Sequence, residues 1–161
     1  MRKSIKVLFV CLGNICRSPT AHGVFQHMIE QEGLSDLVEV DSAGTHAYHV
    51  KNPPDGRAQQ AALRREIDLS PLRARKAIAD DFVVFDYVLA MDEENMANLK
   101  QICPKGMEYK LSLFLDYAPD IGVTEVPDPY YGGTAGFDRV LDLVEEASRG
   151  LISHLQKEHK L

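Results

Sequence analysis

A short segment near the N-terminus carries the residues best suited to covalent chemistry. Cys11 ends an apolar run, Arg17 follows six residues later, and Ser18 and Pro19 come directly after the arginine. A thiolate is a strong nucleophile, and a guanidinium presents a planar fork of donors to two oxygens of an oxyanion at once. The spacing indicates a loop that surrounds a tetrahedral oxyanion, with phosphoryl transfer through the cysteine as the leading hypothesis.

The residues between Cys11 and Arg17 are suited to a nest of backbone N–H groups. Cys11 is expected to lie between a strand end and a helix N-terminus, where the helix dipole and the converging N–H groups favour a thiolate. Gly13 lets the backbone turn without a side chain in the way, Asn14 tolerates a left-handed conformation, and the Ser18 hydroxyl can donate to the sulfur. The predicted anion-binding loop consists of Leu12, Gly13, Asn14, Ile15, Cys16, Arg17 and Ser18.

The structural alternative for this loop is that Cys11 is a small core residue at the end of a buried strand. A chance match to a cysteine, five residues and Arg-Ser in a chain of this size occurs on the order of a per cent of the time. The agreement of the apolar strand, Gly13, Asn14, Arg17 and the Ser-Pro pair favours the functional interpretation.

A carboxylate late in the chain can serve as the acid that such chemistry needs. Asp128 lies between Pro127 and Pro129, and prolines restrict the backbone around it. Phosphoryl transfer from an aryl ester requires an acid that protonates the departing oxygen. The alternative is an ordinary Asp-Pro turn.

The hydrophobic pattern predicts strands that alternate with helices, and therefore a parallel sheet with helices on both faces. Strands are expected at 5–10, 38–42, 87–91 and, as a short one, between 109 and 113. Helices are expected after Ser18 as cap with Pro19 in the first position, at about 55–66, after Asp92 as cap, and in a long amphipathic segment after a loop at 119–136. Ligands bind at the carboxyl ends of such strands, where Cys11, Ser42 and Asp92 fall.

Composition limits the classes of function. The 161 residues fit one domain, 1–161, and a net charge of −6 argues against a general nucleic-acid binder. No apolar stretch reaches the length of a membrane span, and no histidine or cysteine spacing suggests a metal. Three cysteines do not form a secreted disulfide framework, so a reduced, cytoplasmic setting is expected.

The two motifs together resemble the low-molecular-weight protein tyrosine phosphatases. The resemblance spans the whole chain and rests on five segments: C-L-G-N-I-C-R-S-P from Cys11, D-S-A-G at 41–44, N-P-P-D at 52–55, M-D at 91–92, and D-P-Y-Y-G from Asp128. It implies a three-layer, flavodoxin-like α/β fold with a four-stranded parallel sheet in the order 2-1-3-4. It also implies a protein-tyrosine phosphatase without a cofactor, acting on phosphotyrosine-containing proteins and inhibited by phosphate and other oxyanions.

The resemblance also implies roles for individual residues. Cys11 forms a phosphocysteine, Arg17 binds the phosphoryl group, and Asp128 protonates the leaving phenol and then activates water. Asn14, Ser18 and Ser42 hold the loop in shape. Cys16 resembles a second cysteine that traps an oxidised Cys11 as a disulfide, the alternative being a buried spacer.

Aromatic residues near the predicted site are expected to contact the substrate. Tyr48 and Tyr130 resemble walls that sandwich an aromatic ring and favour aryl over alkyl phosphates. Tyr131 either packs or is itself phosphorylated, and exposed Tyr130 and Tyr131 suit weak self-association of a monomer. One departure concerns Leu69-Ser70-Pro71, where many relatives have a histidine that braces the loop asparagine and this chain has a proline.

Three other functions fit parts of the pattern. A related arsenate reductase needs two further cysteines, and only Cys103 lies outside the loop. An arginine-phosphate phosphatase uses the same scaffold but carries threonine in place of Ile15. A non-catalytic phosphopeptide-binding module requires neither Cys11 nor Asp128. The residues present favour the tyrosine phosphatase.

Overall fold

The computed structural model describes residues 4–130 and 133–161. Four parallel strands form one sheet in the order β2-β1-β3-β4, which confirms the predicted topology. The strands are β1 (Ile5–Cys11), β2 (Val38–Gly44), β3 (Tyr87–Ala90) and β4 (Leu111–Leu113). The register places Cys11, the last residue of the inner strand β1, directly beside Gly44 at the end of β2.

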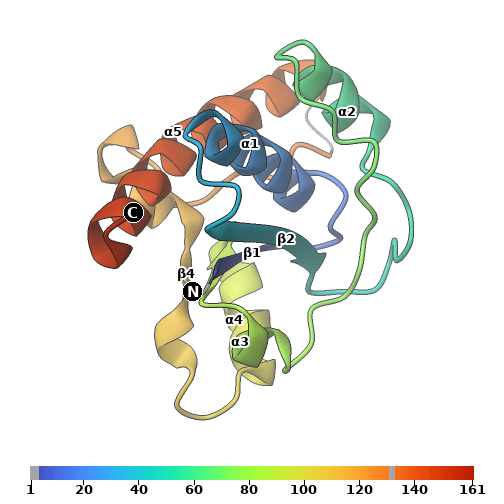
Figure 1. Cartoon of the computed structure of the whole chain (residues 1–161). Coiled ribbons are helices and arrows are strands. Elements are labelled where there is room, and N and C mark those ends of the chain that lie inside the picture. The colour runs from blue at the N-terminus through green and yellow to red at the C-terminus, as the bar shows by residue number, and fades with distance from the viewer. Residues whose placement is uncertain (1–3, 131–132) are drawn as a thin grey trace.

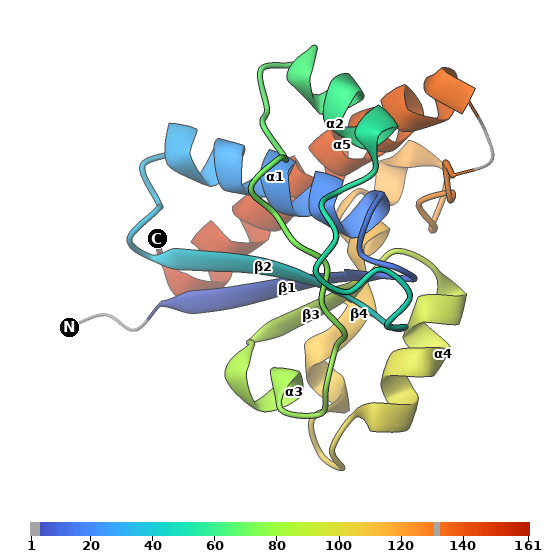
Figure 2. The ribbon, with the colours of Figure 1, turned by 90° about the vertical axis from the view of Figure 1, so that its right-hand side faces the viewer.

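Helices cover both faces of the sheet, as Figures 1 and 2 show. One face carries α1 (Arg17–Gln31), α2 (Gly56–Leu63) and α5 (Gly133–His159), and the other carries α3 (Asp81–Val84) and α4 (Glu93–Ile102). Short 3₁₀ turns η1 (Glu108–Lys110), η2 (Phe114–Tyr117) and η3 (Pro119–Ile121) flank β4. The architecture is the three-layer α/β fold that the sequence predicts.

The central strand β1 is apolar because it is covered on both sides. Val7 and Phe9 belong to the core under α1 and α5, whereas Leu8 and Val10 belong to the core over α3 and α4. Each of these four side chains has no solvent exposure. The end of β1 is therefore fixed from above and below, which gives Cys11 a rigid base.

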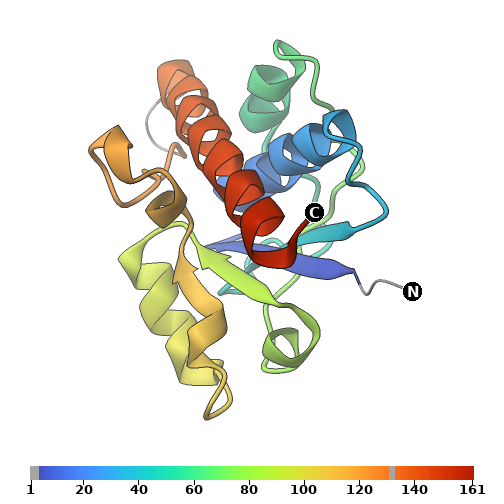
Figure 3. The ribbon, with the colours of Figure 1, turned by 60° about the vertical axis from the view of Figure 1, so that its left-hand side comes forward.

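The strands run in one direction, so the loops at their carboxyl ends gather at one edge of the sheet. The start of β1 and the C-terminal end of α5 lie together on the opposite side of the molecule (Figures 2 and 3). This arrangement brings the segments after β1, β2 and β3 into a single group, and the candidate site lies there.

The start of α1 differs from the prediction. Ser18 was expected to cap this helix with Pro19 in the first position, but the helix begins at Arg17 and its cap position is Cys16. The Ser18 hydroxyl is used elsewhere, since it lies 3.0 Å from the Cys11 sulfur. The predicted cap at Asp92 is confirmed by its side chain, which accepts a 2.7 Å bond from the N–H of Asn95.

Element boundaries shift by a few residues elsewhere. Strands β1 and β2 extend one and two residues further than expected, and β3 ends one residue earlier, at Ala90. The helix expected at about 55–66 ends at Leu63, and the long final helix already begins at Gly133, inside the segment expected to be loop. The four-residue helix α3 was not predicted. Only Asp81 and Phe82 of this helix are buried, and two buried residues are too few to show a helical period. No helix among residues 4–130 and 133–161 is long and apolar enough to cross a membrane.

Candidate active site

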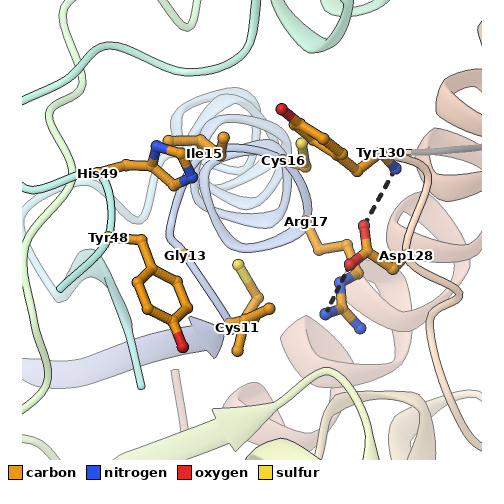
Figure 4. Close-up of a pocket in the computed structure, with 10 residues that line it drawn as sticks. Cys11, Gly13, Ile15, Cys16, Arg17, Tyr48, His49, Asp128 and Tyr130 are labelled. Carbon is orange, nitrogen blue, oxygen red and sulfur yellow. Dashed lines mark hydrogen bonds and ion pairs between the residues drawn. The ribbon is translucent and has the colours of Figure 1, made fainter. Parts of the chain in front are cut away.

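Cys11 lies at the base of a pocket of about 250 Å³ at the carboxyl edge of the sheet. The thiol belongs to a residue that is only 3% exposed. The pocket brings together most of the predicted site residues, and Figure 4 shows them around the sulfur. It is lined by Cys11, Leu12, Gly13, Ile15, Cys16, Arg17, Tyr48, His49, Asp128 and Tyr130.

The Cys11 sulfur has a hydroxyl donor beside it. Ser18 Oγ lies 3.0 Å from Cys11 Sγ and 3.3 Å from the carbonyl oxygen of Ala43. The Asn14 side-chain amide donates a 2.8 Å bond to the same Oγ, which leaves the Ser18 proton for the sulfur or for that carbonyl. When Cys11 is ionised, its sulfur can only accept, so Ser18 donates to the thiolate.

Asn14 holds the loop in its turn. Its φ of 59° confirms the predicted left-handed conformation, which asparagine tolerates better than most residues. Its side-chain oxygen accepts a 3.1 Å bond from the backbone N–H of Arg75. The backbone of Arg75 thus braces the asparagine in a chain that has proline at position 71.

Arg17 is buried and held by oxygens on two sides. Its guanidinium donates to Asp92 Oδ2 at 2.6 Å and to the carbonyl oxygen of Val126 at 3.0 Å. Burial alone would lower the pKa of Arg17, but the negative charges of Cys11, Asp92 and Asp128 outweigh burial and raise it. Arg17 therefore stays cationic, and its orientation is fixed before any anion binds.

The sequence analysis expected Asp92 as a helix cap at the ligand-binding edge of the sheet, but it missed the ion pair of this residue with Arg17. Asp92 performs both tasks with different oxygens, since Oδ1 caps α4 and Oδ2 binds Arg17. Its position at the carboxyl end of a parallel strand placed it at the same edge as Cys11, but did not show which side chain it binds.

Asp128 lies at the mouth of the pocket, close to the guanidinium. Its Oδ2 is 3.8 Å from Arg17 Nη2, and its Oδ1 accepts a 3.1 Å bond from the backbone N–H of Tyr130. The side chain is 40% exposed. Asp128 thus lies on the solvent side of the buried Arg17 guanidinium.

Two aromatic rings lie on opposite sides of the opening (Figure 4). Tyr48 is 66% exposed, and the His46 ring stacks against it at 5.0 Å with an interplanar angle of 15°. Tyr130 is 39% exposed. The two tyrosine rings thus border the opening of the pocket. Tyr131, singled out from the sequence, lies outside the described residues.

Cys16 lines the same pocket but is buried and differs chemically from Cys11. Burial raises the pKa of the Cys16 thiol strongly, and the negative charges of Asp55, Cys11 and Asp128 raise it further. Cys16 is therefore a neutral thiol at physiological pH that lines the same pocket as Cys11.

Ser42, predicted to support the loop, makes a different contact. Its hydroxyl pairs with Nδ1 of His22 on α1 at 3.0 Å, and burial lowers the pKa of that histidine, with Asp41 opposing the shift. Ser18 instead contacts the residue that follows Ser42 in β2, through the backbone carbonyl of Ala43. Ser42 thus supports α1 rather than the loop itself.

Comparison with known proteins decides the family. A family model described as low molecular weight phosphotyrosine protein phosphatase matches residues 6–161. The chain belongs to this family. It is 47% identical to the low molecular weight phosphotyrosine protein phosphatase of Schizosaccharomyces pombe over 90% of this chain and 94% of that relative. With the human protein of the same name it shares 40% identity, over 95% of each chain.

Solved structures agree with this assignment. The crystal structure of a protein tyrosine phosphatase from Entamoeba histolytica, with Hepes in the active site, superposes with a TM-score of 0.92. That structure is 42% identical and covers 98% of this chain and 100% of its own. The chain is thus a protein tyrosine phosphatase with the low molecular weight fold.

Gly44 gives this phosphatase room for its loop. A Cβ at position 44 would lie 2.9 Å from the carbonyl oxygen of Leu12, 3.0 Å from the carbonyl carbon of Gly13 and 3.1 Å from the nitrogen of Asn14. All three are backbone atoms of the anion-binding loop, so the clash cannot be relieved by a side-chain rotation. The D-S-A-G segment therefore ends in glycine because the loop packs directly against β2.

We expect Gly44→Ala to lower kcat/KM for an aryl phosphate roughly 10- to 100-fold, because displacement of reacting groups by as little as 1 Å can cost about 100-fold. Steady-state kinetics, with the melting temperature recorded in parallel, measures this effect. Gly56→Ala is the matched control, since a Cβ there meets no atom within 4 Å. Wild-type kcat/KM in Gly44→Ala would show that the loop does not depend on this close approach.

Proposed function

We propose that this phosphatase hydrolyses phosphotyrosine in proteins, and small aryl phosphates, through a phosphocysteine on Cys11. The observation that carries the proposal is the grouping of three side chains in one pocket. Cys11 Sγ lies 3.0 Å from the Ser18 hydroxyl, the Arg17 guanidinium is fixed by Asp92, and Asp128 stands 3.8 Å from that guanidinium. These positions suit Cys11 as nucleophile, Arg17 as anion site and Asp128 as acid.

In the first step the Cys11 thiolate attacks phosphorus, so that a P–S bond forms while the bond from phosphorus to the phenol oxygen breaks. Asp128 gives its proton to that oxygen, and the phenol leaves neutral. The loop N–H groups and Arg17 bind the three equatorial oxygens, whose charge they stabilise in the transition state. The phosphate dianion of the substrate also takes the place of the Asp128 carboxylate as an ion-pair partner of Arg17, while Asp92 remains bound.

In the second step water hydrolyses the phosphocysteine. Asp128, now a carboxylate, takes a proton from water as the water oxygen attacks phosphorus. The P–S bond breaks and its electrons return to Cys11, where the Ser18 hydroxyl stabilises the departing thiolate. The net reaction converts the ester and water into a phenol and inorganic phosphate.

The walls of the pocket favour aryl substrates. Tyr48, Tyr130 and the apolar Ile15 offer flat and nonpolar surface to a phenyl ring, and a guanidinium would find less to bind there. Phosphate and other oxyanions are expected to inhibit by occupying the loop. The Hepes in the active site of the Entamoeba histolytica structure, a sulfonate, supports this expectation.

We expect Asp128→Ala to slow phenyl phosphate, a substrate with a poor leaving group, by about 100- to 10,000-fold, the usual contribution of general acid–base catalysis. Aryl phosphates with good leaving groups should lose much less, because their oxygens depart without protonation. The measurement is kcat/KM across a series of substituted phenyl phosphates.

Cys11→Ser is the accompanying variant and should show no turnover of any member of the series. Equal losses across the series in Asp128→Ala would remove the acid role, and activity in Cys11→Ser would remove the covalent one.

We also propose that Cys16 protects Cys11 from irreversible oxidation in a reducing, cytoplasmic setting. Peroxide converts the Cys11 thiolate to a sulfenic acid, and the Cys16 thiol then attacks that sulfur, so that an S–S bond forms and water leaves. Both residues line one pocket. Cellular thiols would return the disulfide to its active form.

After brief peroxide treatment, dithiothreitol should restore most activity to the wild type and much less to Cys16→Ser. Mass spectrometry of the tryptic peptide from Val7 to Arg17 should show loss of its thiol hydrogens. Cys103→Ser is the control, because Cys103 lies outside the pocket lining, and it should behave as the wild type. Equal recovery in Cys16→Ser would contradict the protective role.

A further inference from the structure

Arg57, in the first turn of α2, joins two parts of the active site without lining the pocket. Its guanidinium grips Asp55 with Nε at 3.1 Å from Oδ1 and Nη2 at 3.0 Å from Oδ2. Asp55 Oδ1 also caps α2 by accepting the Arg57 backbone N–H at 2.8 Å. The pair is therefore held in one geometry by the helix N-terminus and by a two-point ion pair.

This ion pair is fixed to the anion-binding loop. The backbone N–H of Asp55 donates a 2.8 Å hydrogen bond to the carbonyl oxygen of Ile15, in the middle of the loop. Any movement of α2 relative to the loop would break this bond. The positions of Asp55 and Arg57 are consequently fixed relative to the loop that follows Cys11.

The third nitrogen of the Arg57 guanidinium, Nη1, binds the segment that carries Asp128. Nη1 donates to the carbonyl oxygen of Tyr130 at 2.9 Å, and the guanidinium carbon lies 5.1 Å from the centre of the Tyr130 ring. The same guanidinium lies 4.9 Å from the centre of the Phe137 ring, at the start of α5. A planar cation stacks on rings in this way while its edge still donates hydrogen bonds.

Tyr130 in turn holds Asp128. Its backbone N–H donates to Asp128 Oδ1 at 3.1 Å. The backbone of Tyr130 therefore connects Arg57 to the Asp128 carboxylate. On the other side of Asp128, the N–H of Val126 bonds to the carbonyl oxygen of Met91 at 2.8 Å. The acid thus lies between two anchors, one at the end of β3 and one at α2.

We infer that Arg57 is a positioning residue for the general acid and for the aromatic wall. It sets Asp128 and the Tyr130 ring at the correct distance from the phosphoryl group that the loop binds. The inference rests on the proposed roles of Cys11 and Asp128. Loss of Arg57 should impair proton donation to the leaving group and stacking of the substrate ring, while the anion site of Arg17 remains intact.

The test is the leaving-group dependence of Arg57→Ala. For phenyl phosphate kcat/KM should fall about 100-fold, the cost of a displacement near 1 Å, whereas substrates with good leaving groups should lose only a few-fold. Arg57→Lys keeps the charge but not the fork, and it should recover part of the loss. A smaller folded fraction would lower every rate by the same factor, so the slope of the series separates positioning from stability.

Two comparisons make the result decisive. In the double variant with Asp128→Ala, the Arg57→Ala change should add little for phenyl phosphate beyond the few-fold stacking loss, because the acid that it positions is already gone. Arg64→Ala, which removes an exposed ion pair of the same helix region with Asp138, should leave the whole series at wild-type rates.

Equal losses of Arg57→Ala across the series, or multiplicative losses in the double variant, would overturn the positioning role. Failure of the proposed function is a different result, because it would appear in the Asp128→Ala and Cys11→Ser single variants whatever Arg57 does.

Discussion

The proposed reaction depends on a negative charge on a buried sulfur. Cys11 is 3% exposed, and an ion removed from water is costly unless charged or hydrogen-bonding partners replace the water. The Ser18 hydroxyl at 3.0 Å is one such partner, and the positive charge of the buried Arg17 is another. In the proposed reaction Arg17 also binds the equatorial oxygens of the phosphoryl group, so a group that stabilises the empty loop also prepares it for its substrate.

Each partner of the sulfur is itself fixed by a residue further out. Asn14 orients Ser18 and is braced by the backbone of Arg75, while Asp92 orients Arg17. The loop as a whole fits against β2 only because position 44 lacks a side chain. Preorganisation of this kind means that little reorganisation is needed when the transition state forms, which is the main source of electrostatic catalysis.

The sequence was sufficient to predict the sheet and to select Cys11, Arg17 and Asp128 as candidate site residues, because these features leave local signals. A buried parallel strand reads as an apolar run, and the cysteine and arginine are separated by a fixed spacing within one loop. The contacts that orient them are not local. Arg17 and Asp92 are 75 residues apart, and Arg57 and Tyr130 are 73 apart, so only the folded chain shows that they meet. The contact of Ser18 with the Cys11 sulfur was predicted correctly, but its role as a helix cap was wrong, since a hydroxyl has several possible partners and local sequence does not choose among them.

The most direct test of the covalent account is to trap the intermediate. Asp128→Ala, mixed with an aryl phosphate that has a good leaving group and quenched by rapid denaturation in alkali, should accumulate enzyme that carries one phosphoryl group. Mass spectrometry should place that group on the Cys11 sulfur, and it should be absent from Cys11→Ser. Turnover without any phosphorylated enzyme, or a phosphoryl group on another residue, would contradict the central role of this sulfur.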